Sequence, residues 1–171
     1  TEVIEDIIQD TFEENYISVI KGGIEETQTL INLPFDYMFF TGSEKVGQIV
    51  YESAARNLVP VTLELGGKSP VIIDQTANLK VASERISFGK FTNAGQTCVA
   101  PDYILINRKV KNDFIKALRQ TITEFYGENI KESPDFGRIV NKKHFNRLNE
   151  LLETHKSKII FGGNSFEEDL Y

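Results

Sequence analysis

The chain has 171 residues, of which 40% are apolar and 26% charged, and it contains 12 glycines, 5 prolines and one cysteine. This composition is typical of a folded globular protein and excludes a disordered, collagenous or disulfide-stapled chain. With 25 acidic against 19 basic residues the net charge is −6 and no basic cluster is present, so we expect no nucleic-acid partner. No apolar stretch is long enough to cross a bilayer and no signal-peptide pattern leads the chain, so we expect no transmembrane segment and a cytoplasmic location.

The single cysteine, Cys98, cannot form a disulfide within the chain, which fits a reducing compartment. Its thiol is therefore either buried and inert or used chemically. The chain begins at Thr1 without an initiator methionine and enters a helical pattern within two residues. We therefore expect these residues to be part of a longer protein, although their number suffices for about one domain with a sizeable core.

Helix and strand patterns alternate along the first 65 residues. Apolar residues recur at three- and four-residue intervals from Val3 to Phe12 and predict a helix. The patterns that follow predict, in chain order, a strand over 16–20, a helix over 25–32, a strand over 36–40, a helix buried through Val46, Ile49, Val50 and Ala54, and a strand over 60–65. This alternation is typical of βαβ crossovers on a parallel sheet that is covered on both faces.

The regular alternation of helix and strand patterns changes after Gly66-Gly67, where we place a domain boundary. The later patterns predict a strand over 70–74, a helix over 78–91, a loop over 92–102, a strand over 103–107, a helix buried through Val110, Phe114, Leu118, Ile122 and Phe125, a helix using Phe145, Leu148, Leu151 and Leu152, and a strand over 158–161. The sequence therefore predicts an α/β fold in two parts.

The first candidate site is the turn Thr41-Gly42-Ser43 between a predicted strand and a predicted helix. A helix N-terminus presents unpaired N–H groups and the positive end of the helix dipole, and Gly42 would let a phosphate approach the backbone. The same residues also suit an ordinary helix start, with Ser43 as N-cap and Gly42 as a turn residue. No complete glycine-rich phosphate motif decides between the two.

The second candidate is Glu64, which stands in an otherwise apolar strand and is followed by Gly66-Gly67. An acid is disfavoured inside a buried strand. At the carboxyl end of a parallel strand, however, a carboxylate is placed to act as a general base. The alternative is an edge strand in which Glu64 faces water.

The third candidate is Cys98, which lies in a loop rich in glycine and polar residues. There an exposed thiolate could reach a carbonyl carbon, and backbone N–H groups could stabilise an oxyanion. A lone cysteine is otherwise a small buried apolar residue. His144 and His155 fall among Asn, Lys and Glu, so we expect both to be solvated, and no residue spacing predicts a metal site.

Three motifs taken together resemble the aldehyde dehydrogenase superfamily. They are Phe40-Thr41-Gly42-Ser43, Glu64-Leu65-Gly66-Gly67-Lys68-Ser69-Pro70 and, with Cys98 34 positions after Glu64, Gly95-Gln96-Thr97-Cys98-Val99-Ala100-Pro101-Asp102-Tyr103. Three further segments are most similar to the class 3 branch of fatty or aromatic aldehyde dehydrogenases: Gly22-Gly23, Leu58-Val59-Pro60-Val61-Thr62 and Phe125-Tyr126-Gly127-Glu128. The resemblance runs over essentially all 171 residues.

The resemblance implies that the protein oxidises a small-molecule aldehyde to the carboxylic acid with NAD or NADP as cofactor. By position, Cys98 is the nucleophile that forms a thiohemiacetal and then a thioester, and its backbone N–H is half of the oxyanion hole. Glu64 activates the hydrolytic water. The positions that match the cofactor site are Gly42, Ser43, Val46 and Gly47 for the pyrophosphate, and Gly66 for the nicotinamide.

The resemblance also implies an aldehyde dehydrogenase-like α/β fold. Residues 1–66 would be the C-terminal half of a Rossmann-type NAD(P)-binding domain, and residues 67–171 the N-terminal part of the catalytic domain. The second oxyanion donor, an asparagine, would belong to a segment before Thr1, and the parent protein would be a cytoplasmic or loosely membrane-associated homodimer. Two alternatives are left open: a relative that passes the thioester to coenzyme A, against which Glu64 argues, and a non-catalytic member in which Cys98 and Glu64 only pack.

Overall fold

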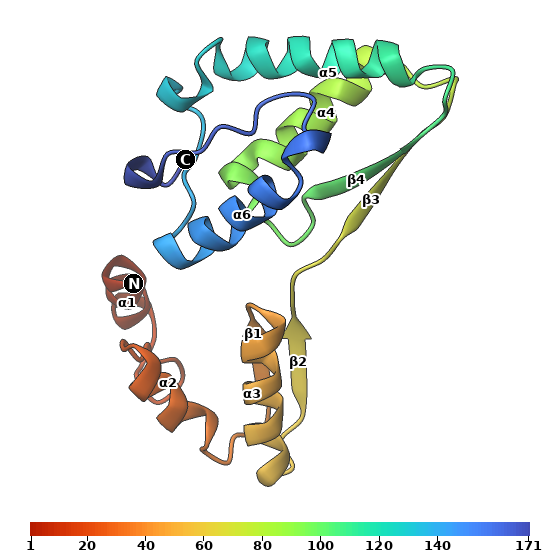
Figure 1. Cartoon of the computed structure of the whole chain (residues 1–171). Coiled ribbons are helices and arrows are strands. Elements are labelled where there is room, and N and C mark those ends of the chain that lie inside the picture. The colour runs from red at the N-terminus through yellow and green to blue at the C-terminus, as the bar shows by residue number, and fades with distance from the viewer. The chain divides into compact units, whose positions relative to one another are not determined.

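The computed structural model describes all 171 residues, and the chain divides into two compact units, Thr1–Leu65 and Gly66–Tyr171. Each unit has a two-stranded sheet of its own (Figure 1). The first unit contains α1 (Glu2–Thr11), α2 (Ile24–Ile31), β1 (Met38–Thr41), α3 (Glu44–Arg56) and β2 (Val61–Glu64). The second contains β3 (Ser69–Ile73), α4 (Leu79–Phe91), β4 (Pro101–Ile106), α5 (Lys111–Tyr126) and α6 (Lys142–Thr154), with short 3₁₀ turns at Thr92–Gly95, Ile130–Glu132, Lys156–Lys158 and Glu167–Asp169.

In the first unit, α3 connects two parallel strands. β1 and β2 pair in register from Met38 beside Val61 to Thr41 beside Glu64, so their carboxyl ends lie at the same edge. The buried core consists of Met38, Val50, Ala54 and Val59. The predicted βαβ crossover is confirmed here, and it places the turn between β1 and α3 next to the end of β2.

The buried face of α3 differs from the predicted stripe. Two of the four predicted residues are buried, whereas Val46 and Ile49 are 42% and 48% exposed. Gly47 and Ser53 are buried in their place. The Ser53 hydroxyl lies 2.8 Å from the Ile31 carbonyl oxygen at the end of α2. Apolar periodicity carries no information on such a polar contact, nor on a glycine at a close approach, and these two features decide which face turns inward.

Two predicted strands are absent. Neither residues 16–20 nor residues 158–161 form a strand, and Tyr16 and Ile20 are exposed. A β-rich segment becomes a strand only where a neighbour pairs with its N–H and C=O groups. Neither segment pairs with any of the four strands, so both predictions were wrong. The other predicted helices and strands form within a few residues of their expected bounds.

In the second unit, α4 connects β3 to β4, which are also parallel and pair from Pro70 beside Tyr103 to Ile73 beside Ile106. α4 lies against β4 and against α5. In this unit Ile72 and the neighbouring Leu105 are 77% and 55% exposed. The expectation of a sheet covered on both faces concerned the first unit, and it is wrong there because Phe39 of β1 is 68% exposed. None of the helices combines the length and the apolarity that crossing a membrane requires.

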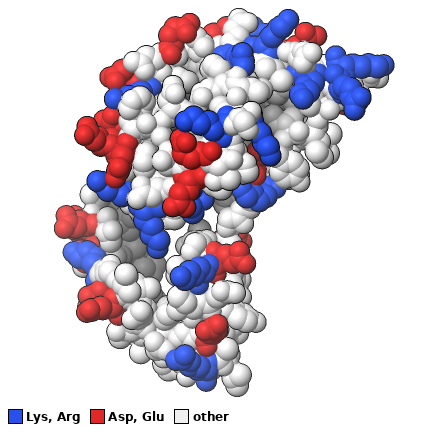
Figure 2. Space-filling view, in the orientation of Figure 1, with Lys and Arg blue, Asp and Glu red and all other residues white.

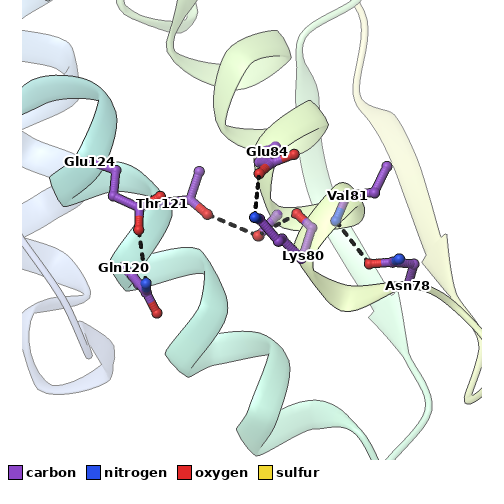
Figure 3. A network of polar contacts seen from close by, with 8 residues as sticks. Asn78, Lys80, Val81, Glu84, Gln120, Thr121 and Glu124 are labelled. Carbon is purple, nitrogen blue, oxygen red and sulfur yellow. Dashed lines mark hydrogen bonds and ion pairs between the residues drawn. The ribbon is translucent and has the colours of Figure 1, made fainter.

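A buried hydroxyl pair joins α4 to α5. The Ser83 Oγ lies 2.8 Å from the Lys80 carbonyl oxygen and 2.9 Å from the Thr121 Oγ1, and Thr121 points from α5 toward α4 (Figure 3). Ser87, one helical turn further along α4, is equally buried, but its hydroxyl has no hydrogen-bond partner. The two serines therefore have opposite effects on stability, because a buried polar group without a partner costs free energy.

We expect Ser83→Ala to lower the free energy of unfolding by about 1–2 kcal/mol, because it leaves the buried Thr121 hydroxyl without a partner. Ser87→Ala is the matched control on the same helix. It is expected to keep or raise that free energy, since the hydroxyl it removes makes no hydrogen bond. Urea unfolding followed by circular dichroism measures both variants, and equal destabilisation by the two substitutions would contradict this account.

Candidate active site

The turn between β1 and α3 forms the expected helix start. The Ser43 side chain accepts a hydrogen bond from the Val46 N–H at 3.4 Å, so Ser43 is the N-cap of α3. The Gly42 N–H donates to the Glu64 carbonyl oxygen at 3.0 Å. The unpaired N–H groups at the start of α3 and the positive end of its dipole therefore lie beside the carboxyl end of β2.

The residues predicted to contact a pyrophosphate differ in their surroundings. Val46, in the first turn of α3, is 42% exposed, whereas Gly47 is buried. A Cβ on Gly47 would lie 2.9 Å from the Leu65 Cδ2, so this glycine lets α3 approach the end of β2 closely. Glu44 also lies in the first turn, where its carboxylate is stabilised by the same helix dipole that would attract a phosphate.

Glu64 is the last residue of β2 and lies opposite Thr41 in the sheet register. The residue is exposed, which agrees with the alternative of an edge strand in which Glu64 faces water. The reason is that the sheet has only two strands, which leaves β2 with an open edge. The structure thus brings the backbone of Glu64 together with Gly42 and Ser43 at one end of the first unit's sheet.

Cys98 is exposed and lies at the corner of a tight turn. The Ala100 N–H donates to the Thr97 carbonyl oxygen at 3.1 Å, which closes a four-residue turn with Cys98 at its second position. Asn93 and Ala94, just before this turn, have φ angles of 55° and 53°. Each left-handed residue other than glycine costs about 1–2 kcal/mol, so contacts from the surroundings must hold the loop in this conformation.

The second glycine after β2, Gly67, lies against the Cys98 turn. A Cβ on Gly67 would lie 3.0 Å from the Cys98 carbonyl oxygen, whereas nothing lies within 4 Å of a Cβ on Gly66. The structure therefore places the predicted nicotinamide position, Gly66, next to the segment that contacts the thiol turn. Glu64 and the helix start at Ser43 belong to the first unit, whereas Gly66, Gly67 and Cys98 belong to the second.

Two polar residues of this region were missed by the sequence analysis. The Gln96 side chain bonds to the backbone of Asn93, Arg138 and Val140. Asp102 accepts a hydrogen bond from Lys68 at 3.3 Å. The only signal in the sequence was a long amide side chain in a loop of small residues, and nothing in it indicated partners 42 and 44 positions away.

An apolar pocket of about 230 Å³ lies beside the same loop. Its lining residues include Ala94, Gly137, Phe145, Leu152 and Tyr171, and Cys98 is not among them. A chain of aromatic contacts runs along this region through Phe91, Tyr126, Phe136, Tyr171 and Phe166. Burial raises the pKa of Tyr126 and of Tyr171 above the ordinary tyrosine value.

The remaining candidates add no chemistry to the site. His144 and His155 are exposed, as expected. No group of three or more His, Cys, Asp or Glu side chains is placed to hold a metal ion. Acidic and basic side chains are both spread over the face shown in Figure 2.

Residues 1–170 match the family described as the aldehyde dehydrogenase family, and the chain belongs to that family. A 4,4'-diaponeurosporen-aldehyde dehydrogenase of Staphylococcus aureus is 68% identical over 169 residues, which are 99% of this chain and 37% of that protein. Aldehyde dehydrogenase family 3 member A2 of Pongo abelii is 52% identical over 153 residues, which are 90% of this chain and 31% of that protein. The resemblance to the class 3 branch is confirmed.

A solved aldehyde dehydrogenase of Mycobacterium tuberculosis, complexed with NAD+, is similar in structure with a TM-score of 0.81. It is 31% identical in sequence, and the match covers 94% of this chain and 34% of that one. The predicted aldehyde dehydrogenase-like α/β fold is therefore confirmed. The chain spans about a third of the length of the curated relatives it matches.

We expect Gly67→Ala to lower the free energy of unfolding by about 1–2 kcal/mol, because the added Cβ would press on the Cys98 carbonyl oxygen, a backbone atom. Gly66→Ala is the matched control, since a Cβ there meets nothing within 4 Å, and we expect a change below about 0.5 kcal/mol. Denaturant unfolding of both variants makes the comparison. Similar losses from the two would show that Gly67 is not in close contact with the thiol turn.

Proposed function

We propose that the protein oxidises an aldehyde to the carboxylic acid with NAD or NADP, through a thioester on Cys98. The observation that carries this proposal is the exposed Cys98 thiol, held in a tight turn against Gly67. Membership of the aldehyde dehydrogenase family supports it. A homodimeric state and a cytoplasmic location belong to the same proposal and rest on the family alone.

The start of α3 is where this chain would hold the dinucleotide. A Cβ on Gly42 would lie 2.6 Å from the Phe40 Cζ, so the Phe40 ring fills the space that a side chain at this position would need. The Ser43 cap aligns the first N–H groups of the helix. These features fit a pyrophosphate group. When bound, the nicotinamide ring supplies the hydride acceptor.

The Cys98 thiolate is the proposed nucleophile. Its sulfur forms a bond to the aldehyde carbon, and the carbonyl oxygen becomes an oxyanion. The hydrogen bond that closes the turn uses the Thr97 carbonyl and the Ala100 N–H, so the Cys98 N–H is available to stabilise that oxyanion. A dinucleotide held at the start of α3 would take up the C–H hydride, which would leave a thioester on Cys98.

Glu64 is the proposed general base for the second half of the reaction. Its carboxylate takes a proton from water, the resulting hydroxide adds to the thioester carbon, and the C–S bond breaks to release the acid and restore the thiolate. Glu64 precedes Gly67 by only three residues. This spacing belongs to a motif that resembles the aldehyde dehydrogenase family, and the family match supports the role proposed for Glu64.

The order of steps is tested in the whole protein that carries this chain. Cys98→Ala should abolish formation of the reduced dinucleotide. Glu64→Gln should lower steady-state turnover by about 10²–10⁴-fold but keep the first burst of reduced dinucleotide, because the base acts only after hydride transfer. Glu52→Gln, also exposed but on α3, is the control and should leave both phases unchanged. Loss of the burst together with turnover in Glu64→Gln would contradict the order, and an active Cys98→Ala would overturn the proposed function.

The proposed dinucleotide site at the start of α3 is tested by removing the N-cap side chain of that helix and, separately, that of α4. We expect Ser43→Ala to weaken dinucleotide binding about fivefold, because loss of an N-cap costs about 1 kcal/mol and loosens the N–H groups that face the phosphates. Asn78→Ala is the matched control, because Asn78 caps α4 through the Val81 N–H in the same way. Titration of the whole protein with NAD measures both dissociation constants. Equal weakening by the two variants would mean that Ser43 acts on general stability and not on the cofactor.

A further inference from the structure

The loop before Cys98 is held in an unfavourable conformation. Asn93, Ala94 and Gly95 are three consecutive left-handed residues, with φ angles of 55°, 53° and 79°. Only the last is a glycine. The other two lie outside the four-residue turn that carries the thiol. Such a backbone persists only where the surrounding structure determines it. The contacts that hold this loop therefore also set the position of Cys98.

Most of these contacts come from one side chain, the amide of Gln96. Its Nε2 donates to the Asn93 carbonyl oxygen at 3.0 Å and to the Arg138 carbonyl oxygen at 2.9 Å. Its Oε1 accepts from the Val140 N–H at 3.0 Å. The amide thus uses both of its donor hydrogens and one acceptor position. It ties the left-handed loop to a segment more than 40 residues further along the chain.

That second segment is itself fixed. The Arg138 guanidinium donates to the carbonyl oxygens of Phe136, at 2.9 Å, and Lys131. The Ile139 N–H donates to the Leu170 carbonyl oxygen at 2.9 Å. Gln96 therefore connects the thiol loop to an anchored part of the second unit and not to a loose one.

We propose that Gln96 is a positioning residue for the Cys98 nucleophile, an inference that rests on the proposed function. Gln96 directly precedes Thr97, the first residue of the turn that places the thiol. Bonds at both ends of its amide fix where this turn begins. Attack on a carbonyl carbon needs the sulfur in a narrow range of positions, and a displacement of about 1 Å far from the reacting atoms can cost about 100-fold in rate.

The test uses Gln96→Met in the whole protein, because methionine has a similar length but makes none of the three hydrogen bonds. Gln120→Met is the matched control, since Gln120 is an exposed residue of α5 whose amide donates only to Glu124. The readout is the single-turnover rate constant for reduced dinucleotide with protein in excess over aldehyde. This constant does not depend on the fraction of folded protein. We expect it to fall about 100-fold in Gln96→Met, with the aldehyde KM changed less than about threefold, and to stay unchanged in the control.

A rate constant within twofold of the wild type overturns the positioning role. If Gln96→Met does not fold, Gln96→Glu replaces it, because a carboxylate can still accept from the Val140 N–H but cannot donate to the carbonyls of Asn93 and Arg138. A loss of tenfold or more in the same constant is expected there, and a rate within twofold of the wild type again overturns the role. Cys98→Ala separates the two proposals. If it stays active, the proposed function fails, whereas an inactive Cys98→Ala beside fully active Gln96 variants removes only the positioning role.

Discussion

Close approach between backbone segments is the constraint on which the thiol loop depends. A Cβ would lie 3.0 Å from the Cys98 carbonyl oxygen at Gly67 and 3.3 Å from the Ala94 nitrogen at Gly137. Because neither residue has a side chain, two distant segments can contact the loop through their backbones. Such van der Waals contacts act only at short range and depend little on angle. The hydrogen bonds of the Gln96 amide depend on angle and therefore also fix the orientation of the loop. An exposed thiol is thereby carried on a loop that is fixed by its neighbours.

In the first unit the corresponding constraint is parallel pairing. Two parallel strands joined by a crossover helix must end at the same edge, so the helix start and the end of the second strand become neighbours. The hydrogen bond from the Gly42 N–H to the Glu64 carbonyl oxygen is the direct result. A helix start suited to an anion and the strand residue that carries the Glu64 side chain are thus neighbours along the backbone, without any special motif.

The segment Leu65–Lys68 connects these two arrangements along the chain. It follows the strand that carries Glu64, and its second glycine contacts the turn that carries Cys98. The two glycines after the acid are therefore more than a turn signal, because the second of them allows a close backbone contact with the turn that carries Cys98.

Local features of the fold and site could be predicted from the sequence, because each depends on neighbours within a few residues. The Ser43 cap, the amphipathic face of α5 and the exposed loop around Cys98 are of this kind. The segment 16–20 was predicted wrongly for the same reason, since its β-rich composition says nothing about whether a second strand is present to pair with it.

The order of motifs and the periodicity of apolar residues therefore determined the family and the succession of helices and strands. Only the tertiary structure decided which face of α3 is buried, that Glu64 is exposed, and that Gln96 bonds to residues 42 and 44 positions away. Helix and turn preferences are set by short-range sterics and hydrogen bonds, which the local sequence encodes. Strand partners, close backbone approaches and long-range amide bonds are set by packing between distant segments, and no local pattern encodes which segments will meet.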